Sequence, residues 1–202
     1  MMSKPKVKVW LSDDEYEELL MNTKKLKYKL MVRLGGEMGL RSKEIANARH
    51  KDIMNHVSDD SDVYKFLRVR SKRTEDKGEH LKKQREVVIP NSLYSDMIMV
   101  KNQYELGDND PIVPSSNNEF YRPQSIRDRI YIISKRTYDN TGNEKFLNVS
   151  SHDLRRYYAH KNLVEHGKNP RVVMNQGGWK NFKSIKPYLD KPSKNVVIKE
   201  ML

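Results

Sequence analysis

The last third of the chain places three chemically capable side chains in a fixed order. His152 and Arg155 stand three residues apart near the start of a helical pattern, so an imidazole and a guanidinium share one helical face. A Gly-Gly-Trp ending at Trp179 follows, and Tyr188 stands nine residues after that tryptophan. An imidazole can move protons near neutral pH, a guanidinium can hold an oxyanion, and an activated phenol can act as a nucleophile. We expect the short amphipathic run at 181–189 to bring the phenol toward the pair.

A second pattern lies upstream, where Gly39 can supply a tight turn and Arg41 begins a short helix that contains Glu44. In this order the chain resembles the tyrosine recombinases, the phage integrase family. In that family a Gly-Leu-Arg-x-x-Glu motif carries the first catalytic arginine. A His-x-x-Arg motif then precedes Gly-His or Gly-Trp, and a nucleophilic Tyr comes nine residues later. The resemblance covers nearly the whole chain.

The resemblance implies a catalytic role for five of these side chains. Tyr188 is the expected nucleophile, and His152 the expected base, because only about one phenol in a thousand is ionised at pH 7. Arg41 and Arg155 are expected to hold the non-bridging oxygens of a pentavalent phosphorane in bidentate fashion. Trp179 is expected to donate its indole N–H to a phosphate oxygen, at a position where many family members carry His.

The sixth expected catalytic residue is a lysine in the connection between two predicted strands, 63–70 and 85–90. In the family, a lysine just after the first strand acts as an acid, and Lys72 occupies that place. It is expected to protonate the departing 5′-oxygen. The connection here is long and rich in lysine, so three other residues stay open as alternatives: Lys77, Lys82 and Lys83.

Several of these residues also have an ordinary structural explanation. Arg41 can be a solvated arginine at a helix start, His152 can cap its helix, and Trp179 can belong to the core. Tyr157 and Tyr158 are expected to pack in the interior rather than to act as nucleophiles. Five matched positions in the family's order favour the catalytic interpretation over these alternatives.

The composition favours a polyanionic partner. The 202 residues carry 39 Lys and Arg against 27 Asp and Glu, which gives a formal net charge of +12. The absence of cysteine excludes a disulfide framework and a cysteine-based zinc site. No apolar run approaches the roughly 20 residues that span a bilayer. The histidines lack the partners and spacing of common metal sites, and no phosphate-binding glycine motif is present, so we expect neither metal nor cofactor.

The spacing of apolar residues predicts several helices and two strands, and the resemblance to the family's catalytic domain implies a mostly helical α+β fold with a small antiparallel sheet. A capping box at Ser12 and Glu15 predicts the first helix. We expect one catalytic domain over 1–202, without the N-terminal core-binding domain of the family. Further helices are predicted at 24–38, after Arg41, from a cap at Asn91 or Ser92, at 123–138, at 152–166 and from Pro170.

The resemblance implies a site-specific recombinase or integrase that cleaves and rejoins DNA strands, without metal, through a covalent 3′-phosphotyrosine. Integration or excision of a mobile or viral element is the expected role, followed by resolution of chromosome or plasmid dimers. A type IB topoisomerase and a non-catalytic DNA-binding relic stay open as alternatives. We expect a cytoplasmic, DNA-associated protein that is a monomer in solution and a tetramer on double-stranded DNA, with no membrane partner. Residues 193–202 are predicted to form a short helix that docks on a neighbouring protomer or on its own domain.

Overall fold

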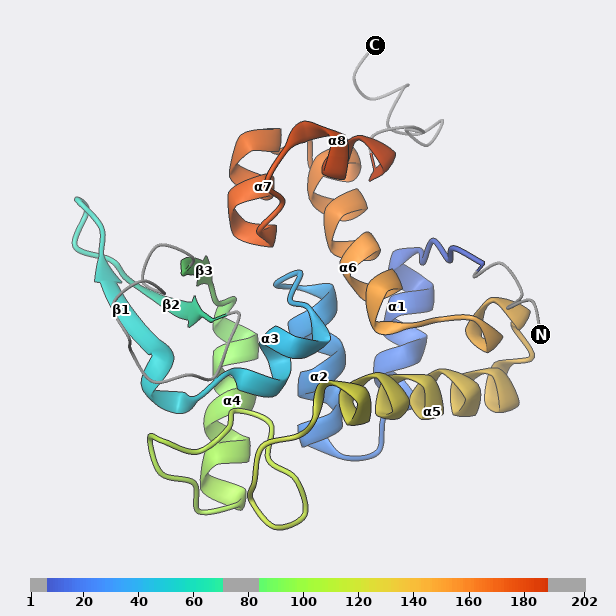
Figure 1. Ribbon diagram of the computed structural model, residues 1–202, viewed down its shortest axis with the longest axis horizontal. Coiled ribbons are helices and arrows are strands. Elements are labelled where there is room, and N and C mark those ends of the chain that lie inside the picture. Colours follow the sequence, from blue (N-terminus) through green and yellow to red (C-terminus); the bar gives the residue numbers. More distant parts are fainter. Residues whose placement is uncertain (1–6, 71–83, 189–202) are drawn as a thin grey trace.

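The computed structural model describes residues 7–70 and 84–188 of the chain. Figure 1 shows a three-stranded sheet on one flank, α5 across the base, and α6 leading up to the short helices α7 and α8. The mostly helical α+β class with a small antiparallel sheet, expected from the sequence, is confirmed. In chain order the elements are α1 Asp13–Met21, α2 Leu26–Gly36, α3 Ser42–Asn47, the 3₁₀ turn η1 His50–Asp52, β1 Ile53–Val57, β2 Val63–Val69, β3 Arg85–Val88, α4 Asn91–Gln103, α5 Pro123–Thr141, the 3₁₀ turn η3 Glu144–Leu147, α6 Ser151–His160, the π turn η4 Lys161–Glu165, α7 Pro170–Gly177, α8 Phe182–Ile185 and the 3₁₀ turn η5 Lys186–Tyr188.

Local capping signals explain where several helices begin and end. At the start of α1 the Ser12 and Glu15 side chains each accept a bond from the other's backbone N–H, which is the predicted capping box. The α5 helix starts with Pro123 in its first turn and stops at Gly142, whose φ of 71° suits glycine. These ends lie close to the predicted ones because a few neighbouring residues encode them.

The cap predicted for α4 is wrong. Pro90 occupies the N-cap position without a side-chain hydrogen bond, and both Asn91 and Ser92 lie inside the helix. The Ser92 hydroxyl instead accepts a hydrogen bond of 2.8 Å from Nη2 of Arg33 on α2. The hydroxyl therefore joins two helices and is not used to cap its own.

The sheet has the strand order β1-β2-β3, and both pairs are antiparallel. β1 was not predicted, because its residues are half-buried or exposed and lack the alternation that marks a strand. On β2, Leu67 and Val69 are buried as their spacing predicts, whereas Val63 at the far end is 55% exposed. The sheet thus buries only one end of β2 in the domain.

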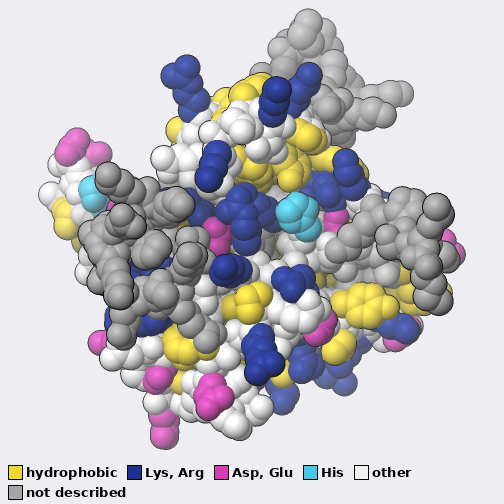
Figure 2. Space-filling model, viewed as in Figure 1, with side chains coloured by type: hydrophobic (Ala, Val, Ile, Leu, Met, Phe, Trp, Pro, Cys, Tyr) yellow, Lys and Arg dark blue, Asp and Glu magenta, His cyan; other side chains and the backbone are white. Residues whose placement is uncertain are grey.

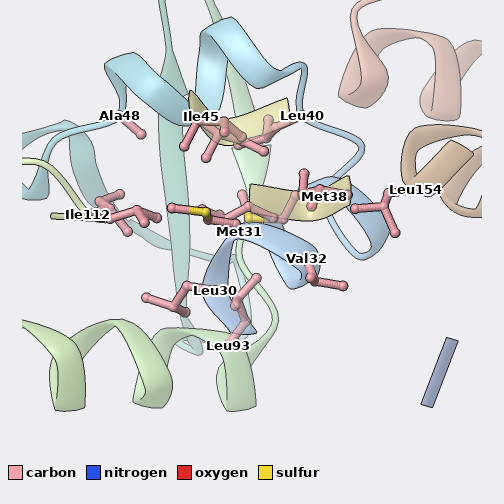
Figure 3. Close-up of a cluster of buried hydrophobic side chains, with 14 of the residues drawn as sticks. Leu30, Met31, Val32, Met38, Leu40, Ile45, Ala48, Leu93, Ile112 and Leu154 are labelled. Atoms are coloured by element: carbon pink, nitrogen blue, oxygen red, sulfur yellow. The ribbon is translucent and has the colours of Figure 1, made fainter. Parts of the chain in front are cut away.

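A main core surrounds α2, which contacts α3, α4, α5 and α6. Figure 3 shows Leu30, Met31 and Val32 of this helix among side chains from its neighbours, including Leu154 of α6. Gly35 permits the close approach, since a Cβ there would lie 3.2 Å from the Leu154 side chain. Gly36 makes similar room for Tyr16, and α2 ends at this glycine, short of the predicted end at residue 38.

A smaller group of buried residues, here called the C-terminal cluster, joins α6 to the end of the described chain. It is separate from the main core and consists of Tyr158, Ala159, Leu163, Val164, Val173, Trp179, Ile185 and Tyr188. Two residues singled out for chemistry, Trp179 and Tyr188, therefore belong to this cluster. Within residues 7–70 and 84–188, none of the helices is both long and apolar enough to cross a membrane.

Candidate active site

Arg41 stands at the N-cap of α3, directly after the turn formed by Gly39 and Leu40. Gly39 has a φ of 64°, and a Cβ there would lie 2.6 Å from the Tyr158 ring, so the turn favours glycine. The Arg41 guanidinium donates to Oε1 of Glu44 at 3.0 Å and to the carbonyl of Gly178 at 3.0 Å. Its side chain is nevertheless 45% exposed. The guanidinium is oriented by protein groups while one side remains open to a ligand.

Arg155 on α6 is almost completely buried, with 2% of its surface exposed. Its Nη1 donates to the Gly39 carbonyl, and its guanidinium carbon lies 3.9 Å from the centre of the Trp179 ring. Among the described residues, Nη2 has no hydrogen-bond partner and no carboxylate forms an ion pair with this side chain. Burial lowers the pKa of Arg155 and the charge of Arg41 lowers it further, but a guanidinium stays protonated at neutral pH.

A buried cation without an anionic partner is costly, and buried polar groups are normally hydrogen-bonded. Arg155 lacks both an acidic partner and a bond to Nη2 within the part of the chain that the structure describes. Arg41 lies near enough to repel it electrostatically. An incoming anion would satisfy this pair of arginines, and the pair is therefore a candidate anion site.

His152 lies one helical turn before Arg155 and lines the same hollow of about 800 Å³ as both arginines. Its side chain is exposed, but partial desolvation lowers the pKa of His152, and the charges of Arg156 and Arg155 lower it further. The imidazole is therefore neutral at pH 7 and able to accept a proton. It does not cap its helix, because Ser150 occupies that position together with Asp153.

Trp179 and Tyr188 meet edge to face, with ring centres 5.6 Å apart and an angle of 62° between the planes. Each is buried in the C-terminal cluster, at 9% and 8% exposure. Gly177 is required at the turn before Trp179, because a Cβ there would lie 1.7 Å from the indole ring. Tyr188 comes from the 3₁₀ turn that follows α8. The indole thus contacts both the phenol ring of Tyr188 and the buried guanidinium of Arg155.

A second hollow, of about 780 Å³, lies on the other side of Arg41 and is lined by Trp179 and Arg85. The two hollows share Arg41 and Lys43 and so form a continuous depression. Figure 2 shows Lys and Arg side chains gathered over the middle of this face, below the region of α7 and α8. The depression is positively charged and open, which suits an extended polyanion better than a small enclosed ligand.

The structure brings five of the six predicted site residues to this depression or into contact with its walls: Arg41, His152, Arg155, Trp179 and Tyr188. Lys72 and its three alternatives lie outside the described residues. Tyr157 and Tyr158 are buried, as expected, and burial raises the pKa of each phenol. The Tyr157 hydroxyl donates to Asp13 on α1, 2.6 Å away, and points away from the arginines.

Arg85, the first residue of β3, also reaches the site, although the sequence analysis did not single it out. It binds both oxygens of Glu44, the residue that also orients Arg41. These partners are 41 residues apart, and no local pattern encodes the contact. Burial alone would raise the pKa of Glu44, but bonds from Arg85 and Arg41 outweigh it and hold the pKa below its ordinary value.

The sequence matches the Phage integrase family over residues 9–194. The chain belongs to this family. No curated protein matches it by sequence. Among the described residues, no group of three or more His, Cys, Asp or Glu is placed to hold a metal ion.

Solved structures of recombinases share the fold of this family member. The crystal structure of XerA recombinase superimposes with a TM-score of 0.72 at 19% identity, covering 95% of this chain and 63% of that one. A lambda integrase dimer bound to a COC′ core site has a TM-score of 0.64 at 17% identity, covering 96% and 62%. The Tn1549 transposon integrase in complex with transposon right end DNA has a TM-score of 0.68 at 15% identity, covering 98% and 66%. The chain thus spans less than two thirds of the length of these recombinases.

Proposed function

We propose that this chain is the catalytic domain of a site-specific DNA recombinase, which cleaves and rejoins strands through a covalent 3′-phosphotyrosine at Tyr188. The observation that carries the proposal is the buried guanidinium of Arg155, which lines a basic depression with Arg41 and whose Nη2 has no hydrogen-bond partner among residues 7–70 and 84–188. Family membership supports it, as do similar structures of lambda integrase and the Tn1549 integrase that contain DNA.

The two arginines stabilise the transition state of cleavage. Attack on a phosphodiester builds a pentavalent phosphorane whose negative charge exceeds that of the ground state. Preorganised guanidiniums hold that charge with little reorganisation at the moment of reaction. Arg41 is held by Glu44 and Gly178, and Arg155 by Gly39, so neither has to be reoriented as the charge develops.

The cleavage step exchanges one phosphate ester for another. The Tyr188 oxygen forms a bond to phosphorus while the bond from phosphorus to the 5′-oxygen breaks. His152, neutral at pH 7, takes the phenolic proton, and the 5′-oxygen takes a proton from a lysine, for which Lys72 is the candidate. Trp179 donates its indole N–H to a phosphate oxygen. The phosphotyrosyl bond conserves the energy of the broken ester, and rejoining runs the step in reverse.

The DNA partner is double-stranded, and the protein acts as a tetramer on DNA and as a monomer in solution. Integration or excision of a mobile or viral element is the role we favour. It is supported by the likeness to lambda integrase and to the Tn1549 transposon integrase. Resolution of chromosome or plasmid dimers is the next role, and the likeness to XerA recombinase and to the XerH site-specific recombinase bound to difH substrate supports recombination at a defined site in either case. The place of action is the cytoplasm, at the DNA.

Covalent capture tests the proposal directly. The 202-residue protein is incubated with nicked duplexes whose core sequence is randomised, and covalent adducts are isolated in denaturing gels and sequenced. We expect an adduct to the 3′-phosphate side that maps to Tyr188 and an enriched core sequence. Adducts without any sequence enrichment would favour a type IB topoisomerase. Tight binding without any adduct would leave a non-catalytic DNA-binding protein and overturn the proposal.

A substrate with a sulfur leaving group tests which lysine protonates the departing 5′-oxygen. A 5′-bridging phosphorothioate needs no proton on departure, so it should restore cleavage by Lys72→Ala but not by Arg41→Ala. Lys82→Ala serves as the matched control from the same connection and should cleave the normal ester at nearly the wild-type rate. Sulfur rescue of Lys82→Ala or Lys83→Ala, in place of Lys72→Ala, would move the acid to the other side of the connection.

A further inference from the structure

Glu44 holds two guanidiniums at once. Its Oε1 accepts from Arg41 Nη1 at 3.0 Å and from Arg85 Nη1 at 2.7 Å. Its Oε2 accepts from the Arg41 backbone N–H at 2.8 Å and from Arg85 Nη2 at 3.0 Å. The side chain is 5% exposed, and all of these bonds form within the protein. One carboxylate thus binds the arginine that faces the depression and a second arginine on β3.

The charge balance of this group bears on the proposed chemistry. A lone Arg41–Glu44 pair would be neutral and would attract a phosphate weakly. Arg85 adds a second positive charge to the same carboxylate, so the three residues together carry a net charge of one positive unit. Arg85 is only 16% exposed, and its fork is fully engaged with Glu44, whereas Arg41 is 45% exposed. The excess charge is therefore available at Arg41.

Arg85 also holds the turn that Arg41 contacts. Its Nε donates to the carbonyl of Gln176 at 2.9 Å, at the end of α7. The Gln176 side chain in turn accepts from the Val88 N–H at 2.9 Å and donates to the Glu86 carbonyl at 3.2 Å. These bonds attach α7 to the edge of β3. They fix the backbone two residues before Gly178, whose carbonyl accepts from Arg41.

Gly178 shows how closely Arg85 fits this turn. The residue has a φ of 68°, and a Cβ there would lie 2.8 Å from Nη1 of Arg85. Arg85 therefore fills the space beside the turn that connects α7 to Trp179. Removing its guanidinium would take two hydrogen bonds from Glu44 and one from the Gln176 carbonyl, and would so loosen both groups that position Arg41.

We propose that Arg85 is a positioning residue for strand cleavage. It balances the charge of Glu44 so that Arg41 keeps its own charge for the phosphate, and it fixes the turn that orients Arg41. The inference rests on the proposed function. It predicts that Arg85 acts on the rate of cleavage and not on the affinity for DNA, since its own fork is already occupied.

The main test compares Arg85→Gln and Arg85→Lys in single-turnover cleavage of a nicked duplex, with affinity measured separately. Arg85→Gln should cleave about 10- to 100-fold more slowly, the range expected when hydrogen bonds to a charged group are lost. The dissociation constant for the duplex should change by less than about threefold, because many other cations contact phosphates. Arg85→Lys keeps the charge without the fork and should recover part of the rate. Wild-type cleavage by Arg85→Gln, or equal losses of rate and affinity, would overturn the proposal.

A second arginine–glutamate fork supplies the matched control. Arg33 on α2 binds both oxygens of Glu37, at 2.6 and 2.9 Å, with 12% of its side chain exposed, and lies away from the depression. Arg33→Gln should lower the melting temperature and leave the cleavage rate of the folded protein unchanged. An equal loss of rate in Arg33→Gln would reduce the Arg85 effect to general destabilisation and defeat the inference.

A double-mutant cycle with Glu44→Gln tests whether Arg85 affects the cleavage rate through Glu44. In that background Arg85→Gln should slow cleavage by less than about threefold further, because the carboxylate that it balances is gone. Fully multiplicative losses would show that Arg85 does not act through Glu44 and would overturn its charge-balancing role. A sulfur leaving group should not restore Arg85→Gln, since the loss lies in charge stabilisation and not in protonation.

Binding of inorganic sulfate tests the same inference without turnover. The titration follows the fluorescence of Trp179, which packs on Arg155, in a Trp10→Phe background. Arg85→Gln should bind sulfate several-fold more weakly than the parent, and Arg33→Gln should match the parent. Equal sulfate affinity in Arg85→Gln and the parent would overturn the charge-balancing role. If the parent forms no covalent adduct with DNA, the proposed recombinase function fails, while the sulfate titration still decides the role of Arg85.

Discussion

The main core and the C-terminal cluster support different halves of the candidate site. The main core surrounds α2, where Leu30, Met31 and Leu34 are fully buried, and it holds the turn and short helix that present Arg41. The C-terminal cluster has eight buried residues from short elements, and it holds Trp179 and Tyr188. Regions with fewer buried apolar contacts open at lower free energy. We therefore expect Arg41, the candidate charge-stabilising residue, to stand on the more stable region, and Tyr188, the candidate nucleophile, on a region that opens more easily.

The α6 helix joins these two regions. Leu154 and Tyr157 belong to the main core, whereas Tyr158 and Ala159 belong to the C-terminal cluster. Arg155 on the same helix contacts both regions, because it bonds to the Gly39 carbonyl on one side and stacks on Trp179 on the other. The buried guanidinium is therefore placed where movement of the small cluster would change its surroundings.

Loss of the Tyr188 hydroxyl is the largest expected effect. Tyr188→Phe keeps the ring that packs on Trp179 and so should leave folding and DNA affinity unchanged, while abolishing the covalent adduct. Adduct formation with a nicked duplex is the measurement. Tyr158→Phe, in the same cluster, is the control and should retain the adduct. An adduct that persists in Tyr188→Phe would assign the nucleophile to another residue.

Cavities cut into the two regions should have different consequences. Leu34→Ala in the main core should lower the free energy of unfolding by about 2–5 kcal/mol, as large-to-small core changes do. Ile185→Ala in the C-terminal cluster should mainly speed hydrogen exchange of amides in α6 to α8, with a smaller change in global stability. Denaturant titration and hydrogen exchange distinguish the two. Equal global losses would show that both regions unfold as one unit.

Each arginine should matter more for cleavage than for binding. Arg41→Ala and Arg155→Ala should each raise the cleavage barrier by about 2–4 kcal/mol, the cost of losing one preorganised donor. Affinity for DNA should fall only slightly, because many other cations contact phosphates. Lysine should not restore either rate, since it cannot form a bidentate fork. Equal losses in binding and cleavage would instead identify backbone anchors.

Sequence reading predicted the features that neighbouring residues encode. The Ser12 capping box, the Gly39 turn and the start of α5 at Pro123 all follow from a few adjacent residues. The shared hollow of His152 and Arg155 likewise follows from their spacing on one helix. The geometry of the site was predictable to that extent, although the catalytic roles remain predictions.

Contacts between distant segments could not be predicted in this way. The fork from Arg85 to Glu44 and the bond from Arg85 to Gln176 cross 41 and 91 residues, and neither end has a distinctive local pattern. The ring centres of Trp10 and Tyr188 lie 6.3 Å apart, although the two residues come from opposite ends of the chain. The burial of β1 is too slight to give an alternating pattern. The predicted Lys72 and the predicted helix at 193–202 lie outside the described residues.

The smallest expected effect is on the pH dependence of stability and of cleavage. It distinguishes the role of His152 from the roles of the arginines beside it. Desolvation and the charges of Arg156 and Arg155 lower the pKa of His152, so the folded protein keeps the imidazole neutral below its ordinary value of about 6.5. In that range the unfolded chain binds more protons, so the stability contributed by His152 falls as the pH drops through the folded pKa.

The rate of cleavage should depend on the protonation of the same imidazole. The wild-type rate should hold at pH 7 and fall only at pH values below about 6.5, where the imidazole becomes protonated and cannot act as a base. His152→Asn should be slower at pH 7 and should lose this acidic limb, whereas His56→Asn, on the exposed end of β1, should keep it. Single-turnover rates measured between about pH 5 and 8 give the comparison. If the rate of His152→Asn still falls at acidic pH as the wild-type rate does, the titration belongs to another group. His152 would then act as a hydrogen-bonding residue and not as the base.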